Sequence, residues 1–169
     1  MPIPPPDFVL MSGSRTGNAP TSPVAISAPS LAPHDLLQVF CHSDIARIPF
    51  RSSDQATGFN LYSAESKIMP IGGRVLVDMQ LSILVPEGTY GCIAPHSGLA
   101  VKFGLTTGAS VINPNYRSKV YILLFNLGKH ELEISVSDCI AQLILKHVAI
   151  PMVAEVDNLN SIPLEAPAS

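Results

Sequence analysis

Apolar and polar residues alternate along the middle of the chain, over residues 75–85. The apolar positions are Val75, Val77, Met79, Leu81, Ile83 and Val85, and polar side chains stand between several of them. A period of two is typical of a β-strand with one buried and one solvated face. The residues that follow, 86–89 (PEGT), have turn-forming composition, so residues 90–94 are predicted to return as the partner strand of a hairpin.

The same pattern continues towards the C-terminus. Residues 120–126, 132–136 and 140–145 predict three more strands, separated by turns at 128–130 and 137–138. No segment carries a long helical period, and residues 98–103 could form at most a turn or two of helix. Short strands separated by turn residues indicate an all-β barrel or jelly roll.

The first part of the chain has a different composition. Eight of the 16 prolines fall within residues 1–33, together with only two charged residues, Asp7 and Arg15. Such a segment buries too little apolar surface to offset the entropy of ordering it. We therefore expect a disordered Pro/Ser/Ala-rich tail over residues 1–35, one barrel domain over 36–159, and a short tail over 160–169.

Charge and cysteine content narrow the classes of function. The 169 residues carry a net charge of −3 without a basic cluster, which argues against nucleic-acid binding. No apolar run reaches the roughly 18 residues of a membrane-spanning helix, and no signal peptide is visible, so we expect an intracellular protein, cytoplasmic or nuclear. The three cysteines form no CxxC pair and are interpreted as free thiols, and no spacing indicates a His–Cys pair.

Four segments carry more specific information. Residues 58–64 (GFNLYSA), 95–100 (PHSGLA), 108–117 (GASVINPNYR) and 137–144 (SDCIAQLI) resemble, in this order, the first four motifs of the trimeric dUTPases. The resemblance extends over about residues 36–159. It implies a distorted jelly-roll β-barrel, a homotrimer whose active sites are shared between subunits, and hydrolysis of dUTP to dUMP and pyrophosphate with Mg²⁺.

The chain departs from these motifs at the positions that the resemblance assigns to chemistry. Asn113 stands at the position of the catalytic aspartate, the general base, and Asn60 at that of an aspartate near the metal. An amide oxygen can accept a hydrogen bond from water but is too weakly basic to take its proton, and loss of a positioned base lowers a rate by roughly 10²–10⁴-fold. His96 and Cys139 replace arginines, and residues 160–169 hold no glycine-rich fifth motif.

Other motif positions are retained. The resemblance implies substrate-binding roles, or vestiges of them, for Ser97, Gly98, Gly108, Ile112, Tyr116, Gln142 and, in altered form, His96. Tyr116 matches the tyrosine whose ring packs against the deoxyribose, and residues 108–112 match a hairpin that contacts uracil through its backbone. The alternative is that Tyr116 and Gln142 only pack and form hydrogen bonds within the barrel.

Two functions follow from these observations. The departures favour a catalytically inactive pseudoenzyme, retained as an interaction protein with an unknown protein partner or as a sensor that binds dUTP or dUMP. Such a protein resembles the dUTPase-derived proteins of adenoviruses, which act inside host cells. The alternative is a functional or slow dUTP diphosphatase. No cofactor is expected for the pseudoenzyme, no metal is expected at Asn60, and Mg²⁺ enters only with dUTP if activity remains.

Overall fold

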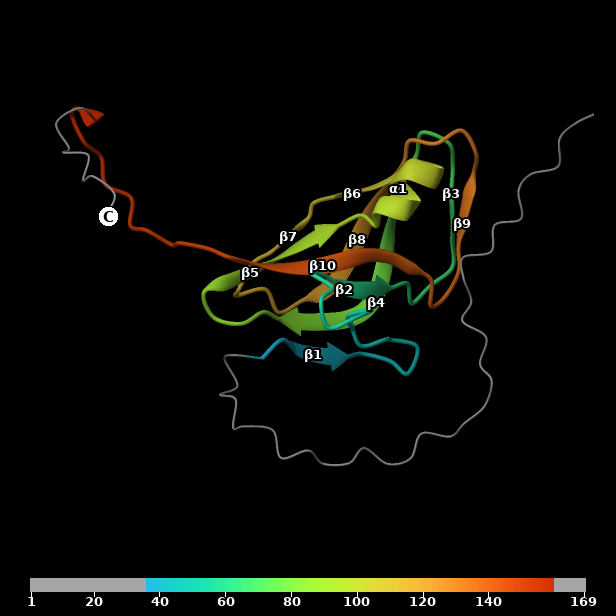
Figure 1. Ribbon diagram of the computed structural model, residues 1–169, viewed down its shortest axis with the longest axis horizontal. Coiled ribbons are helices and arrows are strands. Elements are labelled where there is room, and N and C mark those ends of the chain that lie inside the picture. The colour runs from blue at the N-terminus through green and yellow to red at the C-terminus, as the bar shows by residue number, and fades with distance from the viewer. Residues whose placement is uncertain (1–35, 160–169) are drawn as a thin grey trace, which may run out of the picture.

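The computed structural model describes residues 36–159, which form antiparallel sheets with one short helix (Figure 1). Within this range the elements are β1 (Gln38–Cys41), β2 (Phe59–Tyr62), β3 (Lys67–Met69), β4 (Arg74–Leu84), β5 (Thr89–Ala94), α1 (Ser97–Phe103), β6 (Leu105–Gly108), β7 (Val111–Ile112), β8 (Lys119–Asn126), β9 (Leu132–Ile134) and β10 (Cys139–His147). The predicted all-β fold with a single short helix is confirmed.

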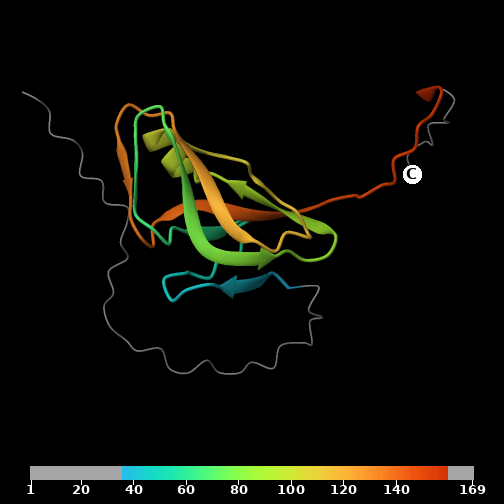
Figure 2. The ribbon, with the colours of Figure 1, turned by 180° about the vertical axis from the view of Figure 1, so that it is seen from behind.

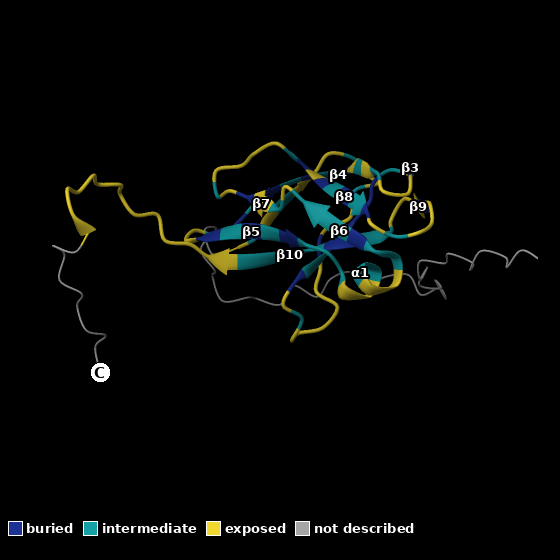
Figure 3. Ribbon diagram, turned by 90° about the horizontal axis from the view of Figure 1, so that it is seen from above, coloured by how far each residue is buried: buried dark blue, intermediate teal, exposed yellow. Residues whose placement is uncertain are grey.

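Two four-stranded sheets make up most of the barrel. One has the strand order β1-β4-β8-β6 and the other β2-β10-β5-β7, while β3 and β9 form a separate two-stranded ribbon. Apolar side chains from both large sheets and from the ribbon meet in one core, which lies inside the exposed loops and helix (Figure 3). The barrel therefore closes around a single apolar interior.

The alternation over residues 75–85 corresponds to β4. Val77, Met79, Leu81 and Ile83 are each at most 2% exposed, and the residues between them are half-buried. The period-two interpretation of this segment is confirmed.

The hairpin predicted from residues 86–89 is wrong. A turn is present, since the Thr89 backbone N–H donates to the Pro86 carbonyl at 3.2 Å and Gly88 has a φ of +72°. However, β4 pairs with β1 and β8, whereas β5 pairs with β10 and β7. The turn carries the chain from one sheet to the other, because turn composition marks a reversal without choosing the next strand's partner.

The helix α1 ends sharply against the turn after β8. Gly104 adopts a φ of +70° and its backbone N–H donates to the carbonyls of Ala100 and Leu99. A Cβ on Gly104 would lie 2.7 Å from the backbone nitrogen of Gly128. This close approach requires glycine and fixes where the motif segment at residues 95–100 sits on the barrel.

The segment after β10, residues 148–159, projects away from the barrel (Figures 1 and 2). Ile150, Met152 and Val153 are 81%, 94% and 98% exposed in the single chain. The predicted tails, residues 1–35 and 160–169, lie outside the described residues. Between residues 36 and 159, no helix has the length and apolar character needed to cross a membrane.

Candidate functional site

Three of the four motif segments meet at one end of the sheet β2-β10-β5. Gln142 on β10 stands in register with Asn60 on β2 and with Ala94 at the end of β5. His96 and Ser97 follow directly after β5, at the start of α1. Antiparallel pairing thus brings residues that are up to 82 positions apart in the chain to one edge of the barrel.

Gln142 explains why the first motif segment begins with glycine. Its Nε2 donates to the Pro95 carbonyl at 3.2 Å, which ties β10 to the start of the second segment. A Cβ on the buried Gly58 would overlap the Gln142 carboxamide. The glycine therefore leaves room for the side chain that joins the three segments.

His96 and Cys139 form a contact that no spacing in the sequence indicated. The Nε2 atom of His96 lies 3.0 Å from the Sγ atom of Cys139. The two residues are 43 positions apart in the chain, so no local spacing could reveal the pair. Burial raises the pKa of the Cys139 thiol to about 11, against the combined effects of a backbone hydrogen bond from Leu61 and the charge of Arg47.

The neighbouring carboxyl group is also affected by its surroundings. Burial raises the pKa of Asp138, assisted by the nearby charge of Glu133, although Asp138 accepts a hydrogen bond from the Ser135 backbone N–H at 2.7 Å. This hydrogen bond fixes the turn that precedes β10. Asp138 therefore has a structural role at the start of the fourth segment.

The side chain of Asn60 points along its own strand. Its Nδ2 donates to the Tyr62 hydroxyl at 3.4 Å. The Tyr62 ring is covered by the Arg47 guanidinium, 4.1 Å from its centroid, and by the Phe50 ring at 5.7 Å. Sequence analysis did not single out Arg47 because it lies in an irregular segment, outside every recognised motif.

The third motif segment builds the turn between β7 and β8, residues 113–118. The side chains of Asn113 and Tyr116 are exposed there. The Tyr116 backbone N–H donates to the Asn113 carbonyl at 3.0 Å, and the Tyr116 hydroxyl donates to the Lys119 carbonyl at 2.7 Å. Arg117 donates to the carbonyls of Pro114 and Tyr116, so its guanidinium braces the same turn.

The strands leading into this turn are held by the core. Gly108 ends β6 opposite Leu123, and a Cβ there would overlap the Phe125 ring. Ile112 is buried and stands in register with Gly91 on β5. The main chain between them passes from one large sheet to the other. Its packing against the core at both ends fixes the position from which the turn at residues 113–118 begins.

The chain does not bring all of the predicted site residues together. Along β5, Ile112 stands opposite Gly91, and β7 runs antiparallel, so Asn113 lies beyond Gly91 and away from Ala94. About four residues of strand then separate the level of Asn113 from Ala94, or roughly 13 Å along β5. Asn60, His96, Ser97, Gly98 and Gln142 form one group at one end of β5, while Ile112, Asn113 and Tyr116 form a second group at the other.

Metal ligands are sparse in the described part of the chain. No group of three or more His, Cys, Asp or Glu side chains within residues 36–159 could hold a metal ion. Mg²⁺ prefers oxygen ligands and is commonly bound through one or two protein groups together with substrate phosphates. The Oδ1 atom of Asn60 fits such a minor contribution; the Cys139–His96 pair, with its sulfur and nitrogen, does not.

Comparison with known proteins identifies the family to which this barrel belongs. The family model described as dUTPase matches residues 44–166. The chain is a member of the dUTPase family. It is 48% identical over 117 residues to the deoxyuridine 5'-triphosphate nucleotidohydrolase of Yarrowia lipolytica, covering 69% of this chain and 74% of that protein. It is 40% identical over 157 residues to the protein of the same name from Rattus norvegicus, covering 88% and 77% of the two chains.

Solved dUTPase structures share the fold. A point-mutant dUTPase of phage phi11 of S. aureus superimposes with a TM-score of 0.70 at 21% identity, covering 75% of this chain and 99% of that one. That structure is described as showing the coordination of a structural Mg(II) ion. The expectation that no cofactor takes part therefore finds no support in the dUTPase comparisons.

The interpretation of this dUTPase-family chain as an inactive pseudoenzyme is wrong. It rested on single-residue departures, whereas relatives that are 40–48% identical over most of the chain are named as the nucleotidohydrolase. These comparisons favour the alternative, an active enzyme. They also give no support to the suggested adenovirus-type origin, since the relatives that establish the family come from yeasts, plants and the rat.

Proposed function

We propose that this chain hydrolyses dUTP to dUMP and pyrophosphate. The observation that carries the proposal is the identity of 48% over 117 residues to a named deoxyuridine 5'-triphosphate nucleotidohydrolase. Water attacks the α-phosphorus, the bond to the bridging oxygen breaks, and pyrophosphate leaves. The substrate is the complex of dUTP with Mg²⁺, in which the ion neutralises part of the charge on the phosphates.

The nucleoside binds at the turn between β7 and β8. The exposed ring of Tyr116 offers an apolar face for the deoxyribose, and its hydroxyl is held by the Lys119 carbonyl. Main-chain groups of residues 108–112 provide donors and acceptors for uracil, with Gly108 and the buried Ile112 keeping this backbone close to the core. We expect the deoxyribose to pack closely against this ring, so that a 2′-hydroxyl on the sugar is disfavoured.

The phosphates bind at the other group of residues. The hydroxyl of Ser97, the imidazole of His96 and the carboxamide of Gln142 lie at the exposed edge of the β2-β10-β5 sheet, where they can donate hydrogen bonds to phosphate oxygens. Within one chain the level of Asn113 lies roughly 13 Å along β5 from this edge, too far for Asn113 to act on an α-phosphate held there. The proposal therefore places the two groups around one substrate from different subunits of a homotrimer.

The exposed segment after β10 supports this assembly. Residues 148–159 carry Ile150, Met152 and Val153 almost fully into solvent in the single chain. Contiguous exposed apolar surface of this kind marks a protein–protein contact. A second and a third copy of the chain would cover it and complete the sites.

Asn113 orients the attacking water. Its Oδ1 can accept one O–H of that water, which places the oxygen for attack, but the proton must leave to solvent because an amide is not a base at neutral pH. Positioning alone still contributes strongly to catalysis. The expected enzyme therefore turns over more slowly than one with a carboxylate at this position.

A pyrophosphate-release assay with purified protein and Mg²⁺ tests the proposal. We expect dUTP to be hydrolysed in preference to UTP, because a 2′-hydroxyl is disfavoured where the sugar packs against the Tyr116 ring. The Tyr116→Ala variant, purified identically, controls for contaminating hydrolase from the expression host. If dUTP hydrolysis is the same for the two proteins, or is absent from both, the proposed function is wrong.

A further inference from the structure

A break in the regular pairing of β4 and β8 lies beside the nucleoside-binding turn. Asp78 pairs with Tyr121 and Ser82 pairs with Lys119, so four residue steps on β4 match two on β8. Within this bulge Gln80 has a φ of +50°, a conformation that costs a non-glycine residue free energy. Such a conformation persists only where surrounding contacts determine it.

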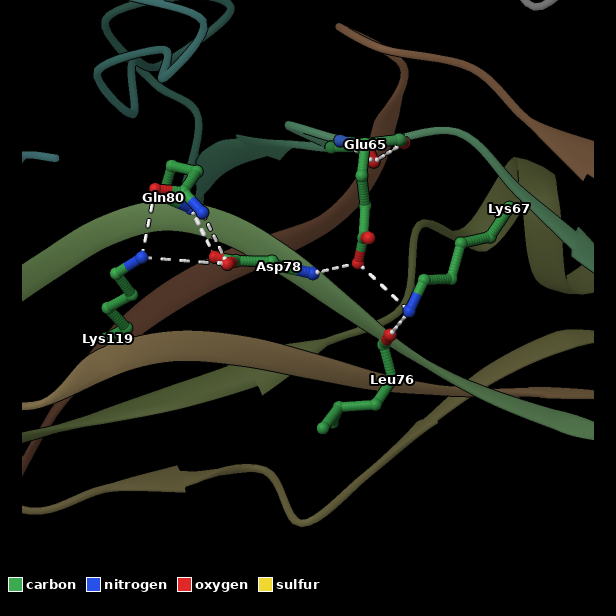
Figure 4. A network of polar contacts seen from close by, with 7 residues as sticks. Glu65, Lys67, Leu76, Asp78, Gln80 and Lys119 are labelled. Carbon is green, nitrogen blue, oxygen red and sulfur yellow. Dashed lines mark hydrogen bonds and ion pairs between the residues drawn. The ribbon is translucent and has the colours of Figure 1, made fainter. Parts of the chain in front are cut away.

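Two of those contacts come from the side chain of Asp78 (Figure 4). Its two oxygens accept the backbone N–H and the side-chain N–H of Gln80, with the backbone hydrogen bond at 2.7 Å. This arrangement leaves the Gln80 carboxamide oxygen pointing to Lys119, whose Nζ donates to it at 3.0 Å. Lys119 Nζ also lies 3.9 Å from Asp78 Oδ2 and forms an ion pair with it.

Lys119 is the point at which this network reaches the site. Its backbone carbonyl accepts the hydrogen bond of the Tyr116 hydroxyl at 2.7 Å. Lys119 is also the first residue of β8, directly after the turn that carries Asn113. Restricting Lys119 therefore restricts both the tyrosine ring and the end of the turn.

The other side of the network leads to the first motif segment. The Asp78 carbonyl accepts the Ala64 backbone N–H at 3.1 Å, and the Asp78 backbone N–H donates to Glu65 Oε1 at 2.7 Å. Lys67 pairs with the same Glu65 oxygen at 3.1 Å and donates to the Leu76 carbonyl (Figure 4). The bulge is thus anchored to the segment that follows β2, which gives it a rigid support.

We infer that Asp78 and Gln80 are positioning residues for the nucleoside-binding turn, and that they act through Lys119 on Tyr116. This inference rests on the proposed function for its effect on dUTP, but the restriction of the turn itself is a property of the ligand-free protein. The left-handed backbone conformation of Gln80 in the bulge directs its carboxamide towards Lys119. Neither residue touches substrate.

Gln80→Gly is the informative variant. Glycine adopts the φ of +50° without strain, so the fold is retained, while the carboxamide that holds Lys119 is removed. Lys119→Met removes the same link from the other end, and Lys119→Arg restores a donor. Lys129→Met, at an exposed lysine in the turn after β8, is the matched control.

Hydrogen exchange followed by mass spectrometry gives the readout that does not depend on activity. We expect Gln80→Gly and Lys119→Met to speed exchange in peptides covering residues 113–121, with exchange in β5 and β10 unchanged, and Lys119→Arg to restore the wild-type rate. Unchanged exchange at the turn would overturn the inference. So would an even increase over all strands, because that pattern reports global stability rather than local positioning.

Steady-state kinetics give the second readout. We expect KM for dUTP to rise about tenfold in Gln80→Gly and Lys119→Met, with a smaller change in kcat, because a displaced binding turn weakens ground-state and transition-state binding together. Lys129→Met should match the wild type. If the wild type does not hydrolyse dUTP, the proposed function fails, while the exchange experiment still decides whether the network positions the turn.

Discussion

The imidazole Nε2 of His96 and the thiol Sγ of Cys139 lie 3.0 Å apart at the exposed end of the sheet β2-β10-β5. Both positions correspond to arginines in the dUTPase motifs that the chain resembles. The contact joins two positions that lie 43 residues apart in the chain. The pair forms because β5 and β10 are neighbours, which places the ends of both strands side by side.

The first prediction concerns the reactivity of this thiol. With a pKa of about 11, only about 0.1% of Cys139 is thiolate at pH 8, and the thiolate is the nucleophile. We expect iodoacetamide to alkylate the exposed Cys41 well before Cys139 at pH 8, and the Cys139 rate to rise about tenfold per pH unit towards pH 11. Peptide mass spectrometry of timed samples measures both rates. Equal labelling of the two cysteines at pH 8 would contradict the assignment.

The second prediction tests the space above Gly58. In Gly58→Ala the new methyl group displaces the Gln142 carboxamide, so its hydrogen bond to the Pro95 carbonyl is lost. We expect the free energy of unfolding, measured by urea titration, to fall by about 1–2 kcal/mol.

The matched control for this change is Gly98→Ala in α1. No atom lies within 4 Å of a Cβ at Gly98, and alanine favours helix over glycine by roughly 0.5–1 kcal/mol. The control should therefore be as stable as the wild type or slightly more stable. A Gly58→Ala protein with wild-type stability would show that Gln142 is free to move aside.

Much of the fold could be predicted from the sequence because β4, β8 and β10 have strong alternation, which reports local burial. The placement of β4 and β5 in different sheets could not be predicted, since the turn at residues 86–89 is compatible with either a hairpin or a passage between sheets. The Gln80 bulge also left no signal, because its φ of +50° is held by Asp78 rather than by a glycine. Contacts between distant side chains decide such features.

The candidate site likewise has features that the sequence predicts and features that only contacts between distant residues decide. Motif resemblance predicts which residues form the site, but it does not show that strand register separates Asn113 from His96 within one chain. The His96–Cys139 pair and the Arg47 contact with Tyr62 depend on neighbours in space, not in sequence. The prediction of an inactive protein rested mainly on Asn113. Sequence identity over most of the chain to relatives named as the enzyme favours activity instead.

The third prediction concerns assembly. The protein should scatter light as a particle of three times the mass of one chain at micromolar concentration, because a trimer covers the apolar segment 148–159. Val153→Asp places a charge on a side chain that is 98% exposed in the single chain and should lower the measured mass. Leu127→Asp, at an exposed leucine in the turn after β8, is the control and should remain trimeric. A monomeric wild type would contradict the shared site.

The last prediction concerns the amide at the position of the general base. Asn113→Asp exchanges an amide for a carboxylate of the same shape on the exposed turn, so the group that orients the water can now also accept its proton. A positioned base contributes roughly 10²–10⁴-fold to a rate, and we expect kcat for dUTP to rise by about 10²-fold, with a loss of activity at low pH as the new carboxyl group is protonated. Pyrophosphate release measured from pH 4 to pH 9 provides both results.

Ser118→Asp adds the same charge to the same turn, away from the water, and should not reproduce this increase. Spontaneous deamidation of Asn113 cannot account for activity of the unmodified protein, because deamidation begins with attack by the following backbone N–H, and Pro114 has none. Turnover by the wild type is therefore the activity of a protein with an amide at position 113, and not of a deamidated fraction. If Asn113→Asp and Ser118→Asp change kcat equally, the effect is one of charge, and Asn113 does not face the attacking water.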